Sequence, residues 1–200
     1  MLEMHAQGQR ALRMDLLGEL HGTVLDVGAG TGAIARELGE MPRVKKVLAI
    51  DPSPAFLDRA RSQGGPKERY LEAYSTTLSD SVESSSVDHA LLWTTLMHIP
   101  ERDHAATFSE MIRVLKPGGI LHVFDNDPCA WDFRMRTHDP LAAVVQAWMD
   151  TMIPDRFLIR RAPKMLSMAG FEVEPLTIHT SVDTTTDSYG YQNVLIRAIE

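Results

Sequence analysis

Cysteine is nearly absent from this chain of 200 residues, since Cys129 is the only one. A single cysteine excludes an internal disulfide and any metal site built from several thiolates, and it suits a reducing compartment. No apolar run approaches the ~18 residues that a membrane-spanning helix needs, and the first residues are polar rather than signal-like. We therefore expect a cytoplasmic protein that does not enter a membrane.

Positive charge is also scarce. Twenty Lys and Arg residues stand against 27 Asp and Glu residues, which gives a formal net charge of −7. The basic residues are scattered, so the chain lacks the basic stripe that displaces counterions from nucleic-acid phosphates. We expect no nucleic-acid partner. A length of 200 residues is enough for one domain with a sizeable core, and we assign residues 1–200 to a single domain.

Glycine, by contrast, is concentrated in one short stretch. Residues 24–32 read VLDVGAGTG, an apolar run that predicts a buried strand and then Gly28, Gly30 and Gly32 at every second position. Three glycines in five residues would weaken a strand or a helix, so they indicate a tight turn that a ligand approaches closely. A helix is predicted to start near residue 31. Its N-terminus would offer free N–H groups and a positive dipole end.

Strands and helices alternate along most of the chain. Strands are predicted over residues 24–27, 46–50, 69–73, 87–93 and 120–124. With helices between them, this pattern predicts an α/β fold with a doubly wound, mostly parallel sheet covered by helices on both faces. Ahead of the sheet, residues 1–21 carry Leu12, Leu16 and Leu20 four apart, which predicts an N-terminal helix.

Polar residues stand at the carboxyl ends of the predicted strands, where ligands of parallel sheets bind. Asp51 ends the second strand, 19 residues after the last glycine of the loop, and Pro52 follows it. One interpretation is a carboxylate that accepts hydrogen bonds from two ribose hydroxyls, and the other is a turn aspartate before proline. Ser53 and Pro54 then predict the cap and first residue of a helix.

The loop Asp26-Val27-Gly28-Ala29-Gly30-Thr31-Gly32 resembles the cofactor loop of class I S-adenosylmethionine-dependent methyltransferases, in particular ubiquinone-biosynthesis-like and natural-product members (methyltransferase type 11 group). Three further stretches carry the same resemblance: LAIDPSP, SVDHALLWTTLMHIP and MIRVLKPGGILHVFD. The resemblance implies a Rossmann-like sheet of seven strands with the last one antiparallel. Residues 171–179 and 191–199 are predicted as a final pair of strands joined by a hairpin, which permits this topology.

The resemblance also implies S-adenosylmethionine as cofactor, with S-adenosylhomocysteine as product, and it assigns roles to particular residues. Asp26 would orient the loop and the amino group of the cofactor, and Asp51 with Pro52 would hold the ribose. The methionine end would lie against Gly28, Ala29, Gly30, Trp93 and Thr94.

One position departs from the family pattern. The family commonly has an acidic residue after the third strand that holds the adenine amino group, whereas this chain has Tyr74 followed by Ser75. Tyr74 could cover the adenine, or Ser75 could donate and accept in place of the acid. Alternatively, Tyr74 is a core aromatic and backbone contacts alone hold the adenine.

Candidate substrate residues follow the fourth and fifth strands. His98 is the candidate general base, because it could take a proton from a hydroxyl, although it could equally hydrogen-bond to a nearby loop. Asp125 and Asp127 could orient a donor group of the substrate or could be solvated turn residues. No cluster with metal-ligand spacing is evident, so no metal is predicted.

Residues 126–161 are too long for a plain connection and sit where the family inserts its substrate cover. Trp131 and His138 are predicted to face the substrate, and residues 141–148 are predicted to be helical. The sequence thus predicts methyl transfer to a small-molecule acceptor through O, N or C, by a monomer or homodimer. The alternatives are a protein or peptide methyltransferase and a non-catalytic subunit that binds S-adenosylmethionine.

Overall fold

The computed structural model describes residues 9–130, 137–139, 142–152 and 155–179. Within these ranges the strands are β1 (Gly22–Val27), β2 (Val44–Asp51), β3 (Glu68–Glu72), β4 (Val87–Trp93) and β5 (Leu115–Phe124). The helices are α2 (Arg10–Leu17), α3 (Ala33–Glu40), α4 (Pro54–Gln63), α5 (His104–Val114), α6 (Ala142–Met152) and α7 (Leu158–Ala169). Three 3-10 turns complete the description: η1 (Leu96–His98), η2 (Glu101–Asp103) and η3 (Pro128–Ala130).

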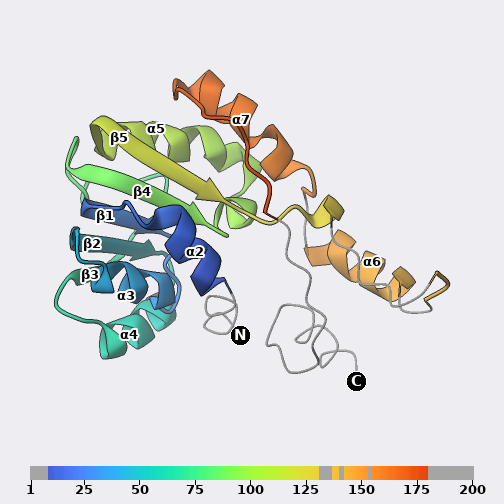
Figure 1. Cartoon of the computed structure of the whole chain (residues 1–200), viewed down its shortest axis with the longest axis horizontal. Coiled ribbons are helices and arrows are strands. Elements are labelled where there is room, and N and C mark those ends of the chain that lie inside the picture. Colours follow the sequence, from blue (N-terminus) through green and yellow to red (C-terminus); the bar gives the residue numbers. More distant parts are fainter. Residues whose placement is uncertain (1–8, 131–136, 140–141, 153–154, 180–200) are drawn as a thin grey trace.

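All five strands form one parallel sheet in the order β3-β2-β1-β4-β5 (Figure 1). Successive side chains of a strand point to opposite faces, so each strand contributes to two cores. Helices α2, α3 and α4 pack on the face that carries Val24 and Leu91, and helices α5 and α7 pack on the face that carries Leu25 and Leu92. The predicted doubly wound α/β fold is therefore confirmed.

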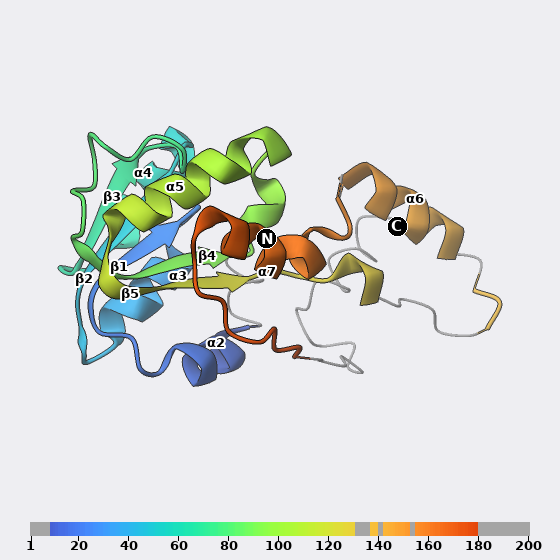
Figure 2. The same ribbon diagram turned by 90° about the horizontal axis from the view of Figure 1, so that it is seen from above.

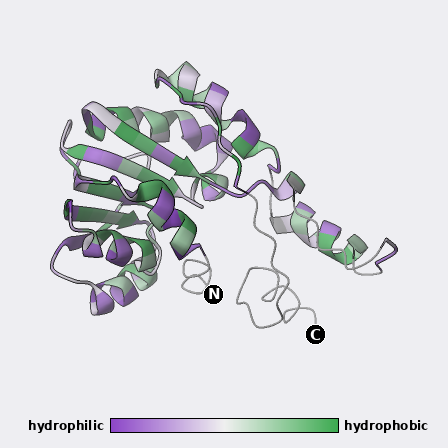
Figure 3. Ribbon diagram, in the orientation of Figure 1, coloured by the Kyte–Doolittle hydropathy of each residue, from purple (hydrophilic) through white to green (hydrophobic). Residues whose placement is uncertain are grey.

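The sheet strands are the most apolar part of the fold, and Figure 3 shows their ribbons as mostly green. The central strands β1, β2 and β4 are mostly buried, as expected for parallel strands between two helical layers, whereas the edge strands β3 and β5 are partly exposed. None of the helices in the described ranges is both long enough and apolar enough to cross a membrane.

The predicted final pair of strands is not part of this sheet as described. Residues 171–179 follow α7 and form no strand, which makes that prediction wrong for the first of the pair. Pro175 lies in the middle of this stretch and has no N–H to donate to a strand ladder. Residues 191–199 lie outside the described residues. The seven strands and the antiparallel last strand implied by the resemblance thus stay predictions, and β5 is one of the two edge strands of the described sheet.

Helix α2 is present where a helix was predicted, but its inward face differs. The predicted stripe included Leu16, whose exposed fraction is 38%. The residues buried on α2 are Arg13 and Leu17. A leucine pattern read alone therefore identified only part of the inward face, since Leu17 and Leu20 are buried and Leu16 is not, and it missed the buried Arg13.

The segment of residues 126–161 contains η3, α6 and the first turn of α7. Helix α6 confirms the predicted helix at residues 141–148 and extends it to Met152. Figures 1 and 2 both show α6 well away from the sheet, on the side toward which the arrowheads of β4 and β5 point. It therefore lies beyond the carboxyl ends of these strands, the edge where ligands of such sheets bind.

Candidate cofactor and substrate site

The glycine loop leaves the carboxyl end of β1. Gly28, Gly30 and Gly32 have φ angles of 76°, 53° and 78°, a region that residues with a side chain rarely adopt. The N–H groups of Gly28 and Ala29 both donate to the Ile50 carbonyl at 2.9 Å, which ties the loop to the end of β2. The loop is thus a tight turn held in place by its neighbouring strand.

Gly28 is needed because the loop after β4 comes very close to it. A Cβ atom at this position would lie 2.6 Å from Thr95 Cγ2 and 2.8 Å from Thr95 Oγ1. Thr95 is itself fixed, since its hydroxyl donates to the Val27 carbonyl at 2.9 Å. The ends of β1 and β4 therefore meet at this contact. Thr95 was not among the predicted site residues, because nothing in the local sequence distinguishes it from Thr94.

Asp51 connects the glycine loop to the start of α4. Its Oδ2 accepts a hydrogen bond from Gly30 N–H at 2.9 Å, and its Oδ1 accepts one from Ser53 N–H at 2.8 Å. These bonds are those of a turn aspartate. Each carboxylate oxygen has a second lone pair, so the predicted contact with ribose hydroxyls is compatible with them and stays a prediction. Pro52 lies beside this carboxylate, and Ser53 caps α4 through its Oγ as predicted.

Asp26 lies near the end of β1 with an exposed fraction of only 2%. Its Oδ2 is buried and has no hydrogen-bond partner among the described residues. Burial raises the pKa of Asp26 to about 7; the charge of Arg13 lowers this pKa, while Asp51 and Glu37 raise it. A buried carboxyl oxygen without a donor is rare in folded proteins. It fits a site whose donor is a ligand.

Trp93 and Thr94 end β4. The Trp93 ring is stacked on Phe124 with 4.2 Å between ring centroids, and its Nε1 donates to Gln9 Oε1 at 3.0 Å. The ring is therefore packed under α2. Thr94 has a φ angle of 52°, a strained backbone that tends to occur at functional sites, and its N–H donates to the Phe124 carbonyl at 2.7 Å. Contact of either residue with a methionine moiety stays a prediction.

Tyr74 and Ser75 follow β3. The exposed fraction of Tyr74 is 66%, so the alternative that Tyr74 is a core aromatic is wrong. The Ser75 hydroxyl lies 2.9 Å from the Thr107 hydroxyl of α5 and thus already has a partner. Of the predicted arrangements, an exposed Tyr74 that covers the adenine fits this geometry.

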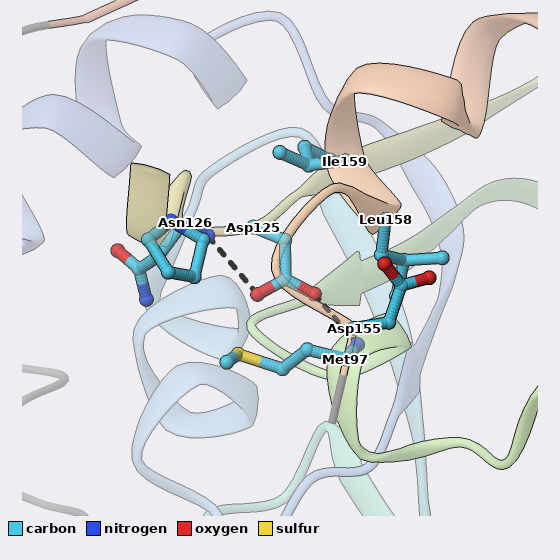
Figure 4. A pocket seen from close by; sticks show the side chains of 7 residues that line it. Met97, Asp125, Asn126, Asp155, Leu158 and Ile159 are labelled. Atoms are coloured by element: carbon cyan, nitrogen blue, oxygen red, sulfur yellow. Dashed lines mark hydrogen bonds between the residues drawn. The ribbon is translucent and has the colours of Figure 1, made fainter. Parts of the chain in front are cut away.

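A small pocket, with room for about one water molecule, lies between the loops that follow β4 and β5 and the start of α7 (Figure 4). The residues that line it are Met97, Asp125, Asn126, Pro128, Asp155, Leu158 and Ile159. Asp125 Oδ2 accepts from Met97 N–H at 2.9 Å, and Oδ1 accepts from Asn126 N–H at 3.1 Å. Burial raises the pKa of Asp125 to about 6, although these N–H groups favour the carboxylate. Asp125 therefore holds the loop after β4 against the end of β5 and also lines the pocket.

The remaining candidate substrate residues differ in their surroundings. His98 is exposed at the end of η1, and the protein atoms around it lower its pKa below 6.5. Asp127 is paired with Arg160 through contacts of 2.8 and 3.0 Å, so it is not a freely solvated turn residue. His138 is exposed. Trp131 lies outside the described residues.

Arg13 is a charged residue of this region that the sequence patterns did not reveal. It is completely buried on α2, and its guanidinium carbon lies 5.5 Å from the centre of the Trp93 ring. The helical pattern alone does not identify it, because an arginine on the inward face needs an acidic partner from a distant part of the chain. That partner is Glu37 on α3.

These residues fit a nucleoside cofactor with an amino-acid end. The glycine loop leaves room for close approach, Asp51 has carboxylate lone pairs for hydroxyl donors, and Asp26 Oδ2 lacks a donor. Among the residues that the structure describes, no group of His, Cys, Asp and Glu could hold a metal ion. The fold and the loop together define a Rossmann-like domain of the class I S-adenosylmethionine-dependent methyltransferase type.

Comparison with known proteins supports the same class. Residues 24–119 match the family described as "Methyltransferase domain". The match begins within β1 and ends in the Lys-Pro-Gly-Gly stretch of β5, so it includes the glycine loop and Asp51. Residues 24–119 are therefore similar to a methyltransferase domain.

Two curated relatives resemble this chain over about half its length. Trans-aconitate 2-methyltransferase of Deinococcus radiodurans is 32% identical over 100 residues, which are 50% of this chain and 36% of the relative. The N-terminal Xaa-Pro-Lys N-methyltransferase 1 of Danio rerio is 30% identical over 108 residues, which are 52% of this chain and 48% of the relative. The chain thus spans less than half the length of either relative.

A solved structure extends the similarity of fold beyond the matched segment. The S-adenosylmethionine-dependent methyltransferase from Mesorhizobium loti has a TM-score of 0.64 and 21% identity, over 84% of this chain and 83% of that one. At this identity the likeness concerns the fold alone.

Proposed function

We propose that this protein transfers a methyl group from S-adenosylmethionine to a small-molecule acceptor. The observation that carries the proposal is the combination of the glycine loop, the donor-free Asp26 oxygen and Asp51 within the segment that matches the methyltransferase domain family. Bound S-adenosylmethionine supplies a methyl group that its sulfonium already activates. The protein then has to orient the acceptor and exclude water.

Different residues of the chain bind the parts of the cofactor and the acceptor. The glycine loop and Asp51 bind the nucleoside part, Asp26 receives the amino group, and Tyr74 covers the adenine. The acceptor lies beyond the carboxyl ends of β4 and β5, where Met97, Leu158 and Ile159 contribute apolar surface. Helix α6, beyond the carboxyl ends of the strands, belongs to the segment that covers the substrate.

His98 is the proposed general base. It follows β4 at the ligand-binding edge of the sheet, and its pKa lies below 6.5. A lowered pKa favours the neutral imidazole, which is the form that takes a proton from an acceptor hydroxyl or amine. Methyl transfer to an acceptor that is already ionised needs no such step.

A peptide acceptor is the second candidate, because the relative from Danio rerio is named for methylation of a protein N-terminus. The two candidates differ in the size of the acceptor that reacts. Incubation with methyl-labelled S-adenosylmethionine, first with trans-aconitate, phenols and small amines and then with short peptides, distinguishes them.

The wild-type protein should label a small molecule, and the Asp51→Ala variant should lose this activity. Asp58→Ala changes an exposed aspartate of the adjacent helix α4 and is the matched control. Labelling of peptides alone would replace the small-molecule proposal with the second candidate. Labelling that survives in Asp51→Ala would contradict the assigned cofactor site.

A further inference from the structure

Arg13 is the buried charge nearest to the proposed cofactor site that the proposed mechanism does not use. Its exposed fraction is 0%, and its Nε and one terminal nitrogen donate to Glu37 Oε2 at 3.0 and 2.6 Å. The guanidinium also lies over the Trp93 ring at the end of β4. Arg13 thus joins three elements, α2, α3 and β4.

A buried arginine is costly unless its charge is compensated. Glu37 provides this compensation from α3, the helix that begins directly after the glycine loop. The contact therefore fixes α2 to the helix whose N-terminus follows the loop. The packing of α2 therefore affects the geometry of the proposed cofactor site.

Asp26 points to the same side of the sheet. It lies two residues after Val24, which packs on the face covered by α2 and α3, and it pairs with Leu91 of β4 on that face. Charged residues on three neighbouring elements change the pKa of Asp26. Arg13 from α2 favours the carboxylate, whereas Glu37 from α3 and Asp51 from β2 oppose it. Tyr70 of β3 is a further titratable group in this region, and the charge of Asp26 raises its pKa.

We propose that Arg13 is a positioning residue of the cofactor site, which supplies the positive charge that keeps Asp26 available as a carboxylate for a cationic amino group. The inference rests on the proposed binding of S-adenosylmethionine. Asp26 Oδ2 needs a donor, and the ammonium group at the amino-acid end of that cofactor is such a donor. Arg13 does not touch the cofactor in this account, because it acts through Asp26 and through α3.

The test compares two ligands by calorimetric titration between pH 6 and pH 9. S-adenosylhomocysteine carries the amino-acid end, and 5′-methylthioadenosine lacks it. In Arg13→Met, the affinity for S-adenosylhomocysteine at pH 7 should fall about fivefold, the effect of a one-unit rise in an Asp26 pKa that starts at about 7. The affinity for methylthioadenosine should stay near that of the wild type. The pH at which S-adenosylhomocysteine binding reaches half its maximum should move upward.

Three further variants make the test independent of simple misfolding. Asp15→Asn removes an exposed charge from the same helix, α2, and should leave the affinities for both ligands and the midpoint pH unchanged. Arg13→Lys keeps the charge and should keep the midpoint near the wild-type value. Glu37→Gln removes an opposing charge and should move the midpoint to lower pH, opposite to Arg13→Met.

The outcomes separate the two levels of the argument. If wild-type protein binds neither ligand, the proposed function fails and this inference fails with it. If wild-type protein binds both ligands and Arg13→Met weakens both equally with no change in midpoint, Arg13 has only a structural role and the inference is overturned. If Arg13→Met does not fold, a Glu37→Gln midpoint equal to the wild-type value overturns it.

Discussion

Gly28 provides the most direct mutational test of the contact between the glycine loop and the loop after β4. In Gly28→Ala, the new Cβ would lie 2.6 Å from Thr95 Cγ2, and the backbone would keep a φ angle of 76°. The left-handed backbone costs ~1–2 kcal/mol for a residue with a side chain. Overpacking adds about 1–3 kcal/mol. We therefore expect the free energy of unfolding to fall by roughly 2–5 kcal/mol.

Two comparisons separate these costs. Gly118 has a nearly equal φ angle of 77°, but a Cβ there would meet no atom within 4 Å. Gly118→Ala should therefore cost only the backbone part, ~1–2 kcal/mol. Thr95→Ala removes the two atoms that the new Cβ would approach most closely. In that background, Gly28→Ala should likewise cost little more than the backbone part.

Urea unfolding of the four members of the Gly28/Thr95 cycle measures the coupling energy, with tryptophan fluorescence as the signal. We expect a coupling of about 1–3 kcal/mol, equal to the overpacking contribution. An identical cost of Gly28→Ala in both backgrounds would refute the close contact, and with it the reason for a glycine at this position.

Three further predictions concern the site. Asp51→Ala should weaken the binding of S-adenosylhomocysteine by at least ~1.5 kcal/mol, the scale of hydrogen bonds to a charged group; an unchanged dissociation constant in calorimetry would remove Asp51 from the site. His98→Ala should slow methyl transfer while leaving S-adenosylhomocysteine affinity intact, and equal losses in both assays would argue for a structural role. Because the folded state raises the pKa of Asp26 from 3.8 to about 7, it binds this proton more tightly than the unfolded chain does. The Asp26 contribution to stability is thus fully present below pH 4 and is lost as the pH rises to about 7. Urea unfolding across this range should show a weaker decline in Asp26→Asn than in wild type, and equal declines would contradict the burial argument.

The parts of the fold that could be predicted from the sequence are those encoded locally. The alternating apolar runs indicated the parallel sheet, and the glycine spacing located the loop between β1 and α3, because both depend on residues close together in the chain. The cap of α4 at Ser53 was predicted for the same reason.

The parts that could not be predicted depend on distant partners. Arg13 faces inward because Glu37, 24 residues later, accepts its charge, and no pattern within α2 indicates this partner. Asp127 appeared as a turn residue because Arg160, 33 positions away, is its partner. Asp125 is similar, since its hydrogen bond with Met97 exists only after β4 and β5 have paired.

The central claim is that the loop at residues 28–32 holds S-adenosylmethionine, and calorimetric titration with its product tests it most directly. We predict that S-adenosylhomocysteine binds the wild-type protein with micromolar affinity or better, whereas NADH gives no binding heat under the same conditions. Binding of NADH without binding of S-adenosylhomocysteine would contradict the account.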